Sequence, residues 1–110
     1  MLKSEFLTQG PKVIDFEKAF ANYIGSKYAI SVSNGTAALH ISLLLSGAKE
    51  NDEILTQPLT FVATCNAISY TNATSVFIDV DKETMGMSPK SLKVFLKEKP
   101  VNFHLVKKIE

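Results

Sequence analysis

Short apolar strands alternate with helical stretches along most of this sequence, and this alternation is the feature that most limits the possible folds. Strands separated by helices of about ten residues pair in parallel through right-handed crossovers. In the first helical stretch, apolar residues recur at helical spacing from Val13 to Tyr23, and Gly25 ends the run. The sequence therefore predicts an α/β layer structure, with strands at residues 28–32, 53–56 and 74–80 and helices at residues 13–24, 36–46, 61–70 and 89–97.

The charge pattern excludes a nucleic-acid-binding surface. The 110 residues carry a formal net charge of +1, and the lysines are scattered rather than gathered in a stripe. All basic residues are lysines, so the chain lacks the planar guanidinium group of arginine, which binds a phosphate through two parallel hydrogen bonds. We therefore expect any phosphate to be held mainly by backbone N–H groups and hydroxyls.

The single cysteine and the lack of long apolar segments bear on location. Cys65 is alone, which excludes an intrachain disulfide and a cysteine-based zinc site and favours a reducing compartment. We interpret Cys65 as a small buried apolar residue. The N-terminus lacks the apolar core of a signal peptide, and the apolar run 41–45 is far too short to cross a bilayer. The sequence thus predicts a cytoplasmic protein with no membrane partner.

The segment "SVSNGTAALH" joins the first predicted strand to the next helix and has two readings. Ser, Asn and Thr side chains commonly cap a helix by accepting a hydrogen bond from a free backbone N–H. The same helix start, with its outward N–H groups and partial positive charge, can instead hold an anion such as a monoester phosphate. The motif matches neither GxGxxG nor GxxxxGK[ST], so by itself it leaves both readings open.

Two further connections from a strand to the next helix follow the later strands, at the ends of the strands where ligands bind in open α/β sheets. Phe61 lies at the start of a predicted helix, where its ring either stacks on a flat ligand or packs in the core, and composition favours the core. Asp79 and Asp81 lie at the end of the third strand, and we interpret their carboxylates as fixing a turn. His40 and His104 do not form a metal pair at ligand spacing, and we assign neither a role.

Several motifs in order identify a family resemblance. The runs "TQGPKVIDFEKAFANYIGSKYAISVSNGTAALHISLLLSG" and "DEILTQPLTFVATCNAISYTNATSVFIDVDKETMGMSP" closely resemble the N-terminal part of the DegT/StrS family of pyridoxal-phosphate aminotransferases, which act on nucleotide-linked keto-sugars. Within the family, the chain looks most like the group that aminates UDP-4-keto-6-deoxy-HexNAc sugars, as for legionaminic acid. The resemblance covers residues 7–96.

The resemblance implies a fold, a cofactor and partners. It implies the N-terminal portion of the large domain of a fold-type I transferase, a mostly parallel sheet with flanking helices, over residues 1–97, with a divergent tail at 98–110. It further implies that Gly35 and Thr36 hold the 5′-phosphate of pyridoxal phosphate and that Phe61 lies against the pyridine ring. The expected partners are a nucleotide-sugar substrate, an amino-acid donor such as glutamate, and a second subunit in a homodimer.

The resemblance also implies that part of the catalytic machinery is missing. The family's Schiff-base lysine and the aspartate that pairs with the pyridine nitrogen come from segments downstream of these 110 residues, so no catalytic residue is assigned in this chain. We therefore expect an incomplete cofactor site and an inactive chain. The alternatives are a small flavodoxin-like module whose loop 33–36 binds a flavin phosphate, and a receiver-like signalling domain, which would need an acidic residue near 32–34.

Overall fold

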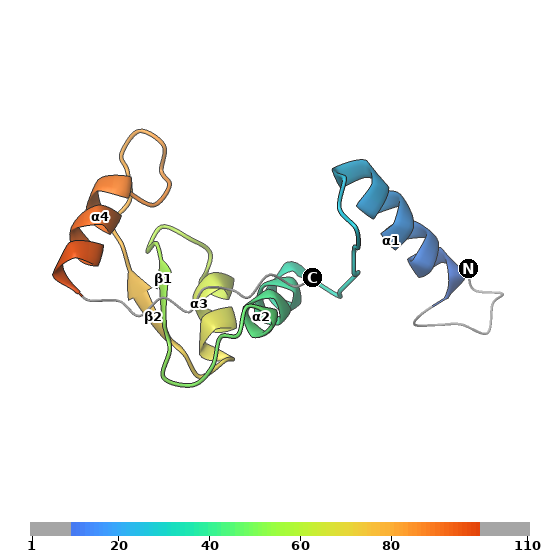
Figure 1. Ribbon diagram of the computed structural model, residues 1–110, viewed down its shortest axis with the longest axis horizontal. Coiled ribbons are helices and arrows are strands. Elements are labelled where there is room, and N and C mark those ends of the chain that lie inside the picture. The colour runs from blue at the N-terminus through green and yellow to red at the C-terminus, as the bar shows by residue number, and fades with distance from the viewer. Residues whose placement is uncertain (1–9, 100–110) are drawn as a thin grey trace. The chain divides into compact units, whose positions relative to one another are not determined.

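The structure, a computed structural model, describes residues 10–99 and consists of two units, which divide between Ser33 and Asn34. The first unit contains helix α1 (Pro11–Ile24). The second unit contains, in order, α2 (Gly35–Leu45), β1 (Glu53–Thr56), α3 (Val62–Ser69), β2 (Thr74–Phe77) and α4 (Pro89–Glu98) (Figure 1). The helices predicted from the sequence are all present, within two residues of the expected bounds.

The residues at the two ends of helix α1 determine where it begins and where it stops. Pro11 occupies the first turn, where its missing N–H costs nothing, and its fixed φ suits a helix start. At the other end Gly25 adopts a left-handed conformation with φ of 72°, and its N–H donates to the carbonyl of Asn22 at 3.3 Å. Glycine reaches this conformation without a Cβ clash, which is why the helix stops there.

The strand predicted at residues 28–32 is not formed, so that prediction was wrong. The Ser26 hydroxyl donates to the Tyr28 carbonyl at 2.8 Å, and the Ser31 N–H donates to a Glu17 carboxylate oxygen at 2.8 Å. β-branched and aromatic residues favour strands only where another strand is available to pair with them. Apart from segment 28–32, the described part of this unit contains α1 and no strand that could pair with it. The backbone N–H of Ser31 therefore bonds to the Glu17 side chain instead.

Strands β1 and β2 of the second unit pair in parallel, as the alternation predicted. The register places Glu53 opposite Thr74 and Thr56 opposite Phe77. Hydrogen bonds of 2.8 Å extend the ladder at both ends, from the Thr74 N–H to the Asp52 carbonyl and from the Ile78 N–H to the Thr56 carbonyl. Figure 1 shows α3 on one side of the two strands and α4 on the other.

Strand β2 is shorter than the predicted 74–80. It ends at Phe77, and Val80 forms only an isolated antiparallel bridge with Met87. The turn between these two residues directs the chain back on itself, which is incompatible with a longer parallel pairing. The sheet therefore has two strands among the described residues instead of the three expected.

The core of the second unit is small and lies where α3 packs against β2. Ala67 and Ile68 of α3 are buried, as are Ala73 and Ile78 on either side of β2. Among residues 10–99, Ile68 and Ile78 are the only large apolar side chains that are buried, with exposed fractions of 2% and 3%. Most of the apolar side chains of this unit therefore remain partly open to solvent.

Two further expectations from the sequence concern the C-terminal tail and helices that could cross a membrane. The tail pattern at Val101, Phe103 and Leu105, which is compatible with a short strand, lies outside the described residues, as does His104. Among residues 10–99, no helix combines the length and the apolar character needed to cross a bilayer.

Candidate cofactor site

The start of α2 is capped by Asn34. The Asn34 side-chain oxygen accepts a hydrogen bond from the Ala37 N–H at 2.9 Å, and its carbonyl accepts one from the Ala38 N–H at 3.1 Å. The first N–H groups of an α-helix have no partner inside the helix, and the Asn34 side chain satisfies that of Ala37. The bond from the Ala38 N–H is the first regular bond of the helix. The N–H groups of Gly35 and Thr36 are the ones left at the helix end.

This arrangement provides donors suited to one anionic group. The Gly35 and Thr36 N–H groups lie at the positive end of the α2 dipole, and the Thr36 hydroxyl is a third donor beside them. Thr36 is half-buried, whereas Gly35 is exposed and has no atom near the position that a Cβ would occupy. A phosphate oxygen can thus approach the Gly35 backbone directly. The capping reading of this joint is confirmed for Asn34, and it is compatible with anion binding by the next two residues.

Phe61 lies at the N-cap of α3 and is not part of the core. Its exposed fraction is 79%, so the expectation that composition alone favoured, a buried ring, was wrong. The Phe61 carbonyl accepts a hydrogen bond from the Thr64 N–H at 3.0 Å, and the hydroxyls of Thr60 and Thr64 bond to each other at 2.9 Å. These contacts fix the backbone at the helix start while the ring remains free to contact a ligand.

The helices that carry these residues are neighbours. Helix α2 packs against α3 (Figure 1). The His40 ring meets the Tyr70 ring edge-on, with centroids 5.5 Å apart. This contact gives His40 a packing role. The structure thus brings together the two helices that begin with Gly35 and Thr36 and with Phe61.

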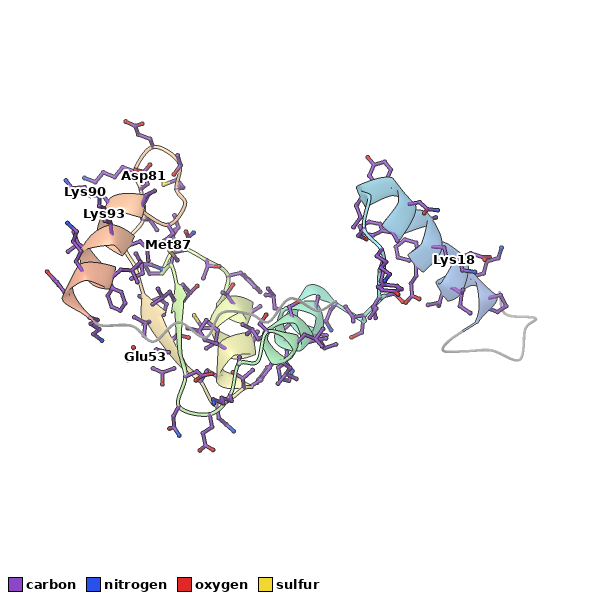
Figure 2. The ribbon with its side chains drawn as sticks, in the orientation of Figure 1. Lys18, Glu53, Asp81, Met87, Lys90 and Lys93 are labelled. Atoms are coloured by element: carbon purple, nitrogen blue, oxygen red, sulfur yellow. The ribbon has the colours of Figure 1, made fainter. Side chains whose placement is uncertain are left out.

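The carboxylates after β2 fix a turn, as the sequence indicated. The Asp79 carboxylate accepts from the Val80 N–H at 2.8 Å. One oxygen of Asp81 accepts from the Thr84 N–H at 2.9 Å, the Thr84 hydroxyl at 3.1 Å and the Glu83 N–H at 3.0 Å. These bonds, those from Thr84 foremost, lower the pKa of Asp81. Figure 2 shows Asp81 on the loop before α4, away from the start of α2.

Cys65 differs from expectation. It is partly accessible instead of fully buried. It lies on α3, a helix that packs on α2 on one side and β2 on another, and this intermediate position explains the partial exposure. Within residues 10–99 there is no cluster of three or more metal-ligating side chains.

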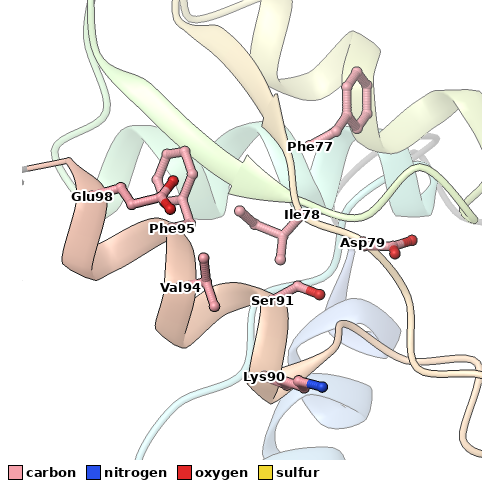
Figure 3. A pocket seen from close by; sticks show the side chains of 8 residues that line it. All are labelled: Phe77, Ile78, Asp79, Lys90, Ser91, Val94, Phe95 and Glu98. Carbon is pink, nitrogen blue, oxygen red and sulfur yellow. The ribbon is translucent and has the colours of Figure 1, made fainter.

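A hollow of about 430 Å³ lies between the end of β2 and α4 (Figure 3). Ile78 from the strand side and Val94 and Phe95 from the helix side give it an apolar floor. Asp79 and Lys90 line it as well, both exposed. The sequence drew attention to Asp79 only. For the lining residues on α4, the only signal in the sequence was the helical pattern, which predicts a packed helix face and no cavity.

Comparison with known proteins identifies the family. The sequence model of the DegT/DnrJ/EryC1/StrS aminotransferase family matches residues 1–101. The chain belongs to this family. It is 46% identical over 98 residues to the uncharacterized protein MJ1066 of Methanocaldococcus jannaschii, covering 89% of this chain and 25% of that protein. It is also 46% identical over 91 residues to the spore coat polysaccharide biosynthesis protein SpsC of Bacillus subtilis, covering 83% of this chain and 23% of SpsC.

Solved structures agree with the fold and the cofactor. The PLP-form of the putative sugar aminotransferase Spr1654 from Streptococcus pneumoniae superimposes with a TM-score of 0.80 at 28% identity, over 84% of this chain and 24% of that one. The same protein is known in a PMP-form. The fold is therefore that of the N-terminal portion of a pyridoxal-phosphate aminotransferase, and the cofactor of this family is pyridoxal phosphate. This chain spans about a quarter of the length of these relatives.

Proposed function

We propose that this chain supplies the phosphate-binding part of the pyridoxal-phosphate site in a sugar aminotransferase. The observation that carries the proposal is the start of α2. There Asn34 caps the Ala37 N–H, which leaves the N–H groups of Gly35 and Thr36 at the helix end in a chain that belongs to this family. A monoester phosphate matches these donors in charge and size. The absence of arginine from the chain leaves backbone and hydroxyl donors as its main phosphate ligands.

Each residue has a separate task in this proposal. Gly35 lets the phosphate approach the backbone, Thr36 donates from both its N–H and its hydroxyl, and the exposed Phe61 ring lies against the pyridine ring. The Thr60–Thr64 hydroxyl pair holds the helix start beneath Phe61. When bound, pyridoxal phosphate supplies the electron sink that allows an amino group to move from donor to acceptor.

The reaction that fits these relatives is amino transfer to a sugar. We infer that the whole enzyme takes the amino group from an amino acid such as glutamate and delivers it to a nucleotide-linked keto-sugar. The name of SpsC, a spore coat polysaccharide biosynthesis protein, supports a role in surface polysaccharide synthesis. The UDP-4-keto-6-deoxy-HexNAc group of substrates, a homodimeric assembly and a cytoplasmic location belong to the same proposal.

The 110 residues alone are proposed to be inactive. None of the lysines stands in the motif that anchors the cofactor in the family, so no residue of this chain is available to hold the cofactor covalently or to move the proton that amino transfer requires.

A chimeric enzyme tests the function. The segment of SpsC that matches this chain is replaced by this chain, and the purified protein is examined for the absorbance of bound pyridoxal phosphate. Amino transfer from glutamate to UDP-4-keto-6-deoxy-HexNAc is then measured, with the unmodified SpsC as control. We expect bound cofactor and turnover. A chimera that folds like SpsC but binds no pyridoxal phosphate, or that binds a flavin, contradicts the proposal.

A further inference from the structure

Gln57 is the first residue of the loop 57–61, which runs from the end of β1 to the start of α3 and carries Phe61. Its side-chain nitrogen donates to the Leu59 carbonyl at 2.8 Å, within the loop. The same nitrogen donates to the Met85 carbonyl at 3.3 Å, 28 residues further along the chain. Both partners are carbonyl oxygens, which only accept, so the nitrogen of the amide and not its oxygen must face them. The Gln57 amide therefore bridges two segments that are far apart in the sequence.

Few other hydrogen bonds hold the loop 57–61, whose last four residues are all exposed. The Thr60 N–H bonds to the Pro58 carbonyl at 3.0 Å, within the loop, and the hydroxyl pair of Thr60 and Thr64 holds the end that meets α3. Among the described residues, the bond from Gln57 to Met85 is the only hydrogen bond that joins the loop to a segment other than β1 or α3. It is thus the contact that fixes the loop against the rest of the second unit.

The turn 81–86, which presents the Met85 carbonyl, is held by several hydrogen bonds. The Asp81 N–H donates to the Gly86 carbonyl at 2.8 Å, and the Met85 N–H donates to the Asp81 carbonyl at 2.9 Å. Among residues 10–99, Met85 is the only residue other than glycine and asparagine with a positive φ, 58°. A side chain with a Cβ adopts this conformation at a cost, and the conformation persists only where its surroundings hold it. The turn that carries Asp81 (Figure 2) thus gives the Met85 carbonyl a fixed direction.

These contacts form a connected series from Asp81 to Phe61. The turn fixes the Met85 carbonyl, the Gln57 amide joins this carbonyl to the loop, and the loop ends at the exposed Phe61 ring. We propose that Gln57 is a positioning residue for pyridoxal phosphate, because it determines where the loop 57–61 holds the ring against which the pyridine ring lies. The inference rests on the proposed function, in which Phe61 contacts the cofactor.

A ring that is held in place before the cofactor arrives binds it at a lower cost than a mobile ring. Binding orders the loops and side chains that contact a ligand, and the entropy lost in this ordering opposes binding. Without the Gln57 bridge, the loop has more conformations to lose when pyridoxal phosphate binds. The net contribution of one neutral hydrogen bond corresponds to about twofold to tenfold in affinity, and we expect a loss of this size for Gln57→Ala.

The competing explanation is that Gln57 only fills space. Its side chain is half-buried, and any side chain of the same length covers the same surface. Gln57→Glu separates the two explanations, because glutamate has nearly the same shape but its ionised carboxylate has no donor for the two carbonyls. If the amide donors matter, Gln57→Glu behaves like Gln57→Ala. If only the shape matters, it behaves like the parent.

The mobility of the ring is measured first, without the cofactor. The chain contains no tryptophan, so Phe61→Trp introduces a single fluorescent reporter at the position of the ring. Time-resolved fluorescence anisotropy of the isolated chain gives the amplitude of the fast local motion of this side chain. Gln57→Ala and Gln57→Glu should both raise that amplitude. Leu59→Ala is the matched control, since it shortens an exposed side chain of the same loop and leaves the carbonyl of residue 59 in place.

Asp81→Ala tests whether Gln57 acts through the turn. Loss of the Asp81 carboxylate should loosen the turn and raise the fast amplitude as well. The double variant Asp81→Ala, Gln57→Ala should then show less than the sum of the two single effects, because both changes break the same series of contacts. Unchanged ring motion in Gln57→Ala, parent-like motion in Gln57→Glu, or strictly additive effects would each overturn the proposal.

The effect on the cofactor is measured in the SpsC chimera described above, with Phe61 unchanged. The dissociation constant of pyridoxal phosphate and the visible circular dichroism of the bound cofactor are compared for the parent, Gln57→Ala, Gln57→Glu and the control Lys82→Ala. We expect both Gln57 variants to bind the cofactor about twofold to tenfold more weakly and with altered dichroism. Lys82→Ala should match the parent.

Affinity and dichroism like those of the parent in both Gln57 variants would overturn the proposal. A parent chimera that folds but binds no pyridoxal phosphate contradicts the proposed function instead. In that case the fluorescence measurement, which needs no cofactor, still decides whether Gln57 holds the ring at position 61.

Discussion

One oxygen of the Glu17 carboxylate accepts two hydrogen bonds from Ser31, one from its backbone N–H at 2.8 Å and one from its hydroxyl at 2.9 Å. This pair links α1 to the segment 28–32 that was expected to be a strand. The two bonds, that from the backbone first, lower the pKa of Glu17.

The Glu17–Ser31 pair should make the order of segment 28–32 depend on pH. Because the pKa of Glu17 is lower in the folded unit than in the unfolded chain, the link is complete above the unfolded pKa and is lost as the pH falls through the folded one. Amide exchange of Ser31 should therefore lose protection in that acidic window. Asp15→Asn serves as a control on the same helix and should leave the profile unchanged. A Ser31 amide whose protection shows no pH dependence in the parent protein would contradict this prediction.

The turn at Asp81 should show the same sign of pH dependence in the second unit. Its carboxylate accepts three hydrogen bonds from Glu83 and Thr84, which lower its pKa. Asp81→Ala removes these acceptors and should lower the denaturation midpoint at neutral pH, and the difference from the parent should shrink as acid protonates Asp81 in the parent. Lys82→Ala, on the same turn, provides the control. An unchanged midpoint for Asp81→Ala would show that the bridge between Val80 and Met87 is sufficient to hold the turn.

Thr36 should matter for cofactor retention in the SpsC chimera. One hydrogen bond to a charged group contributes about 1.5 to 3 kcal/mol, so Thr36→Ala should weaken pyridoxal phosphate binding roughly tenfold to a hundredfold. The control is Ser42→Ala, which removes a hydroxyl from the same helix, where it donates to the Ala38 carbonyl at 2.8 Å. Cofactor loss on dialysis gives the measurement. If both variants retain pyridoxal phosphate equally well, Thr36 does not contribute to cofactor binding, and the prediction is wrong.

The isolated chain should neither transfer an amino group nor form a stable adduct at one lysine. It is incubated with pyridoxal phosphate, reduced with borohydride and digested, and the modified lysines are located by mass spectrometry. We expect low labelling spread over several exposed lysines, since none stands in the family's anchoring motif. One stoichiometrically labelled lysine, or turnover with glutamate and a keto-sugar nucleotide, would refute the proposed inactivity.

The success of the sequence-based predictions depended on whether an element is stabilised locally. Helix α1 stops at Gly25 as predicted, because the backbone preference of glycine acts within a few residues, and it begins at Pro11, two residues before the predicted start. The parallel pairing of β1 with β2 followed from the intervening helix α3. The segment 28–32 has the composition of a strand, but a strand needs a partner, and no pattern within five residues shows whether one is present.

The candidate site shows the same division between local and distant causes. Capping by Asn34 depends on a side chain only three residues from the N–H whose hydrogen bond it accepts, and the sequence left capping as one of two readings of this segment. The exposure of Phe61 depends on what packs around the start of α3, and average burial of aromatic residues gave the wrong expectation. The roles of Gly35, Thr36 and Phe61 toward the cofactor came from the order of several motifs together, since each motif alone was ambiguous.

The last prediction is that the isolated chain associates in solution. On α1, Phe16 and Phe20 stack with ring centroids 5.8 Å apart and remain 57% and 45% exposed. In the second unit, no other strand of the described residues pairs with the side of β1 that faces away from β2, and an open sheet edge templates pairing between molecules. Exposed apolar patches of this kind promote contact between copies, because burying them removes apolar surface from water.

Light scattering combined with size-exclusion chromatography measures this association. The parent chain should elute as oligomers or as a polydisperse population that grows with concentration. The Phe16→Ser, Phe20→Ser double variant should shift toward smaller species, whereas Lys18→Ser, on the same helix, should not (Figure 2). A monodisperse monomer with a single cooperative unfolding transition would contradict the prediction. It would mean that the small core around Ile68 and Ile78 is sufficient to hold a stable domain on its own.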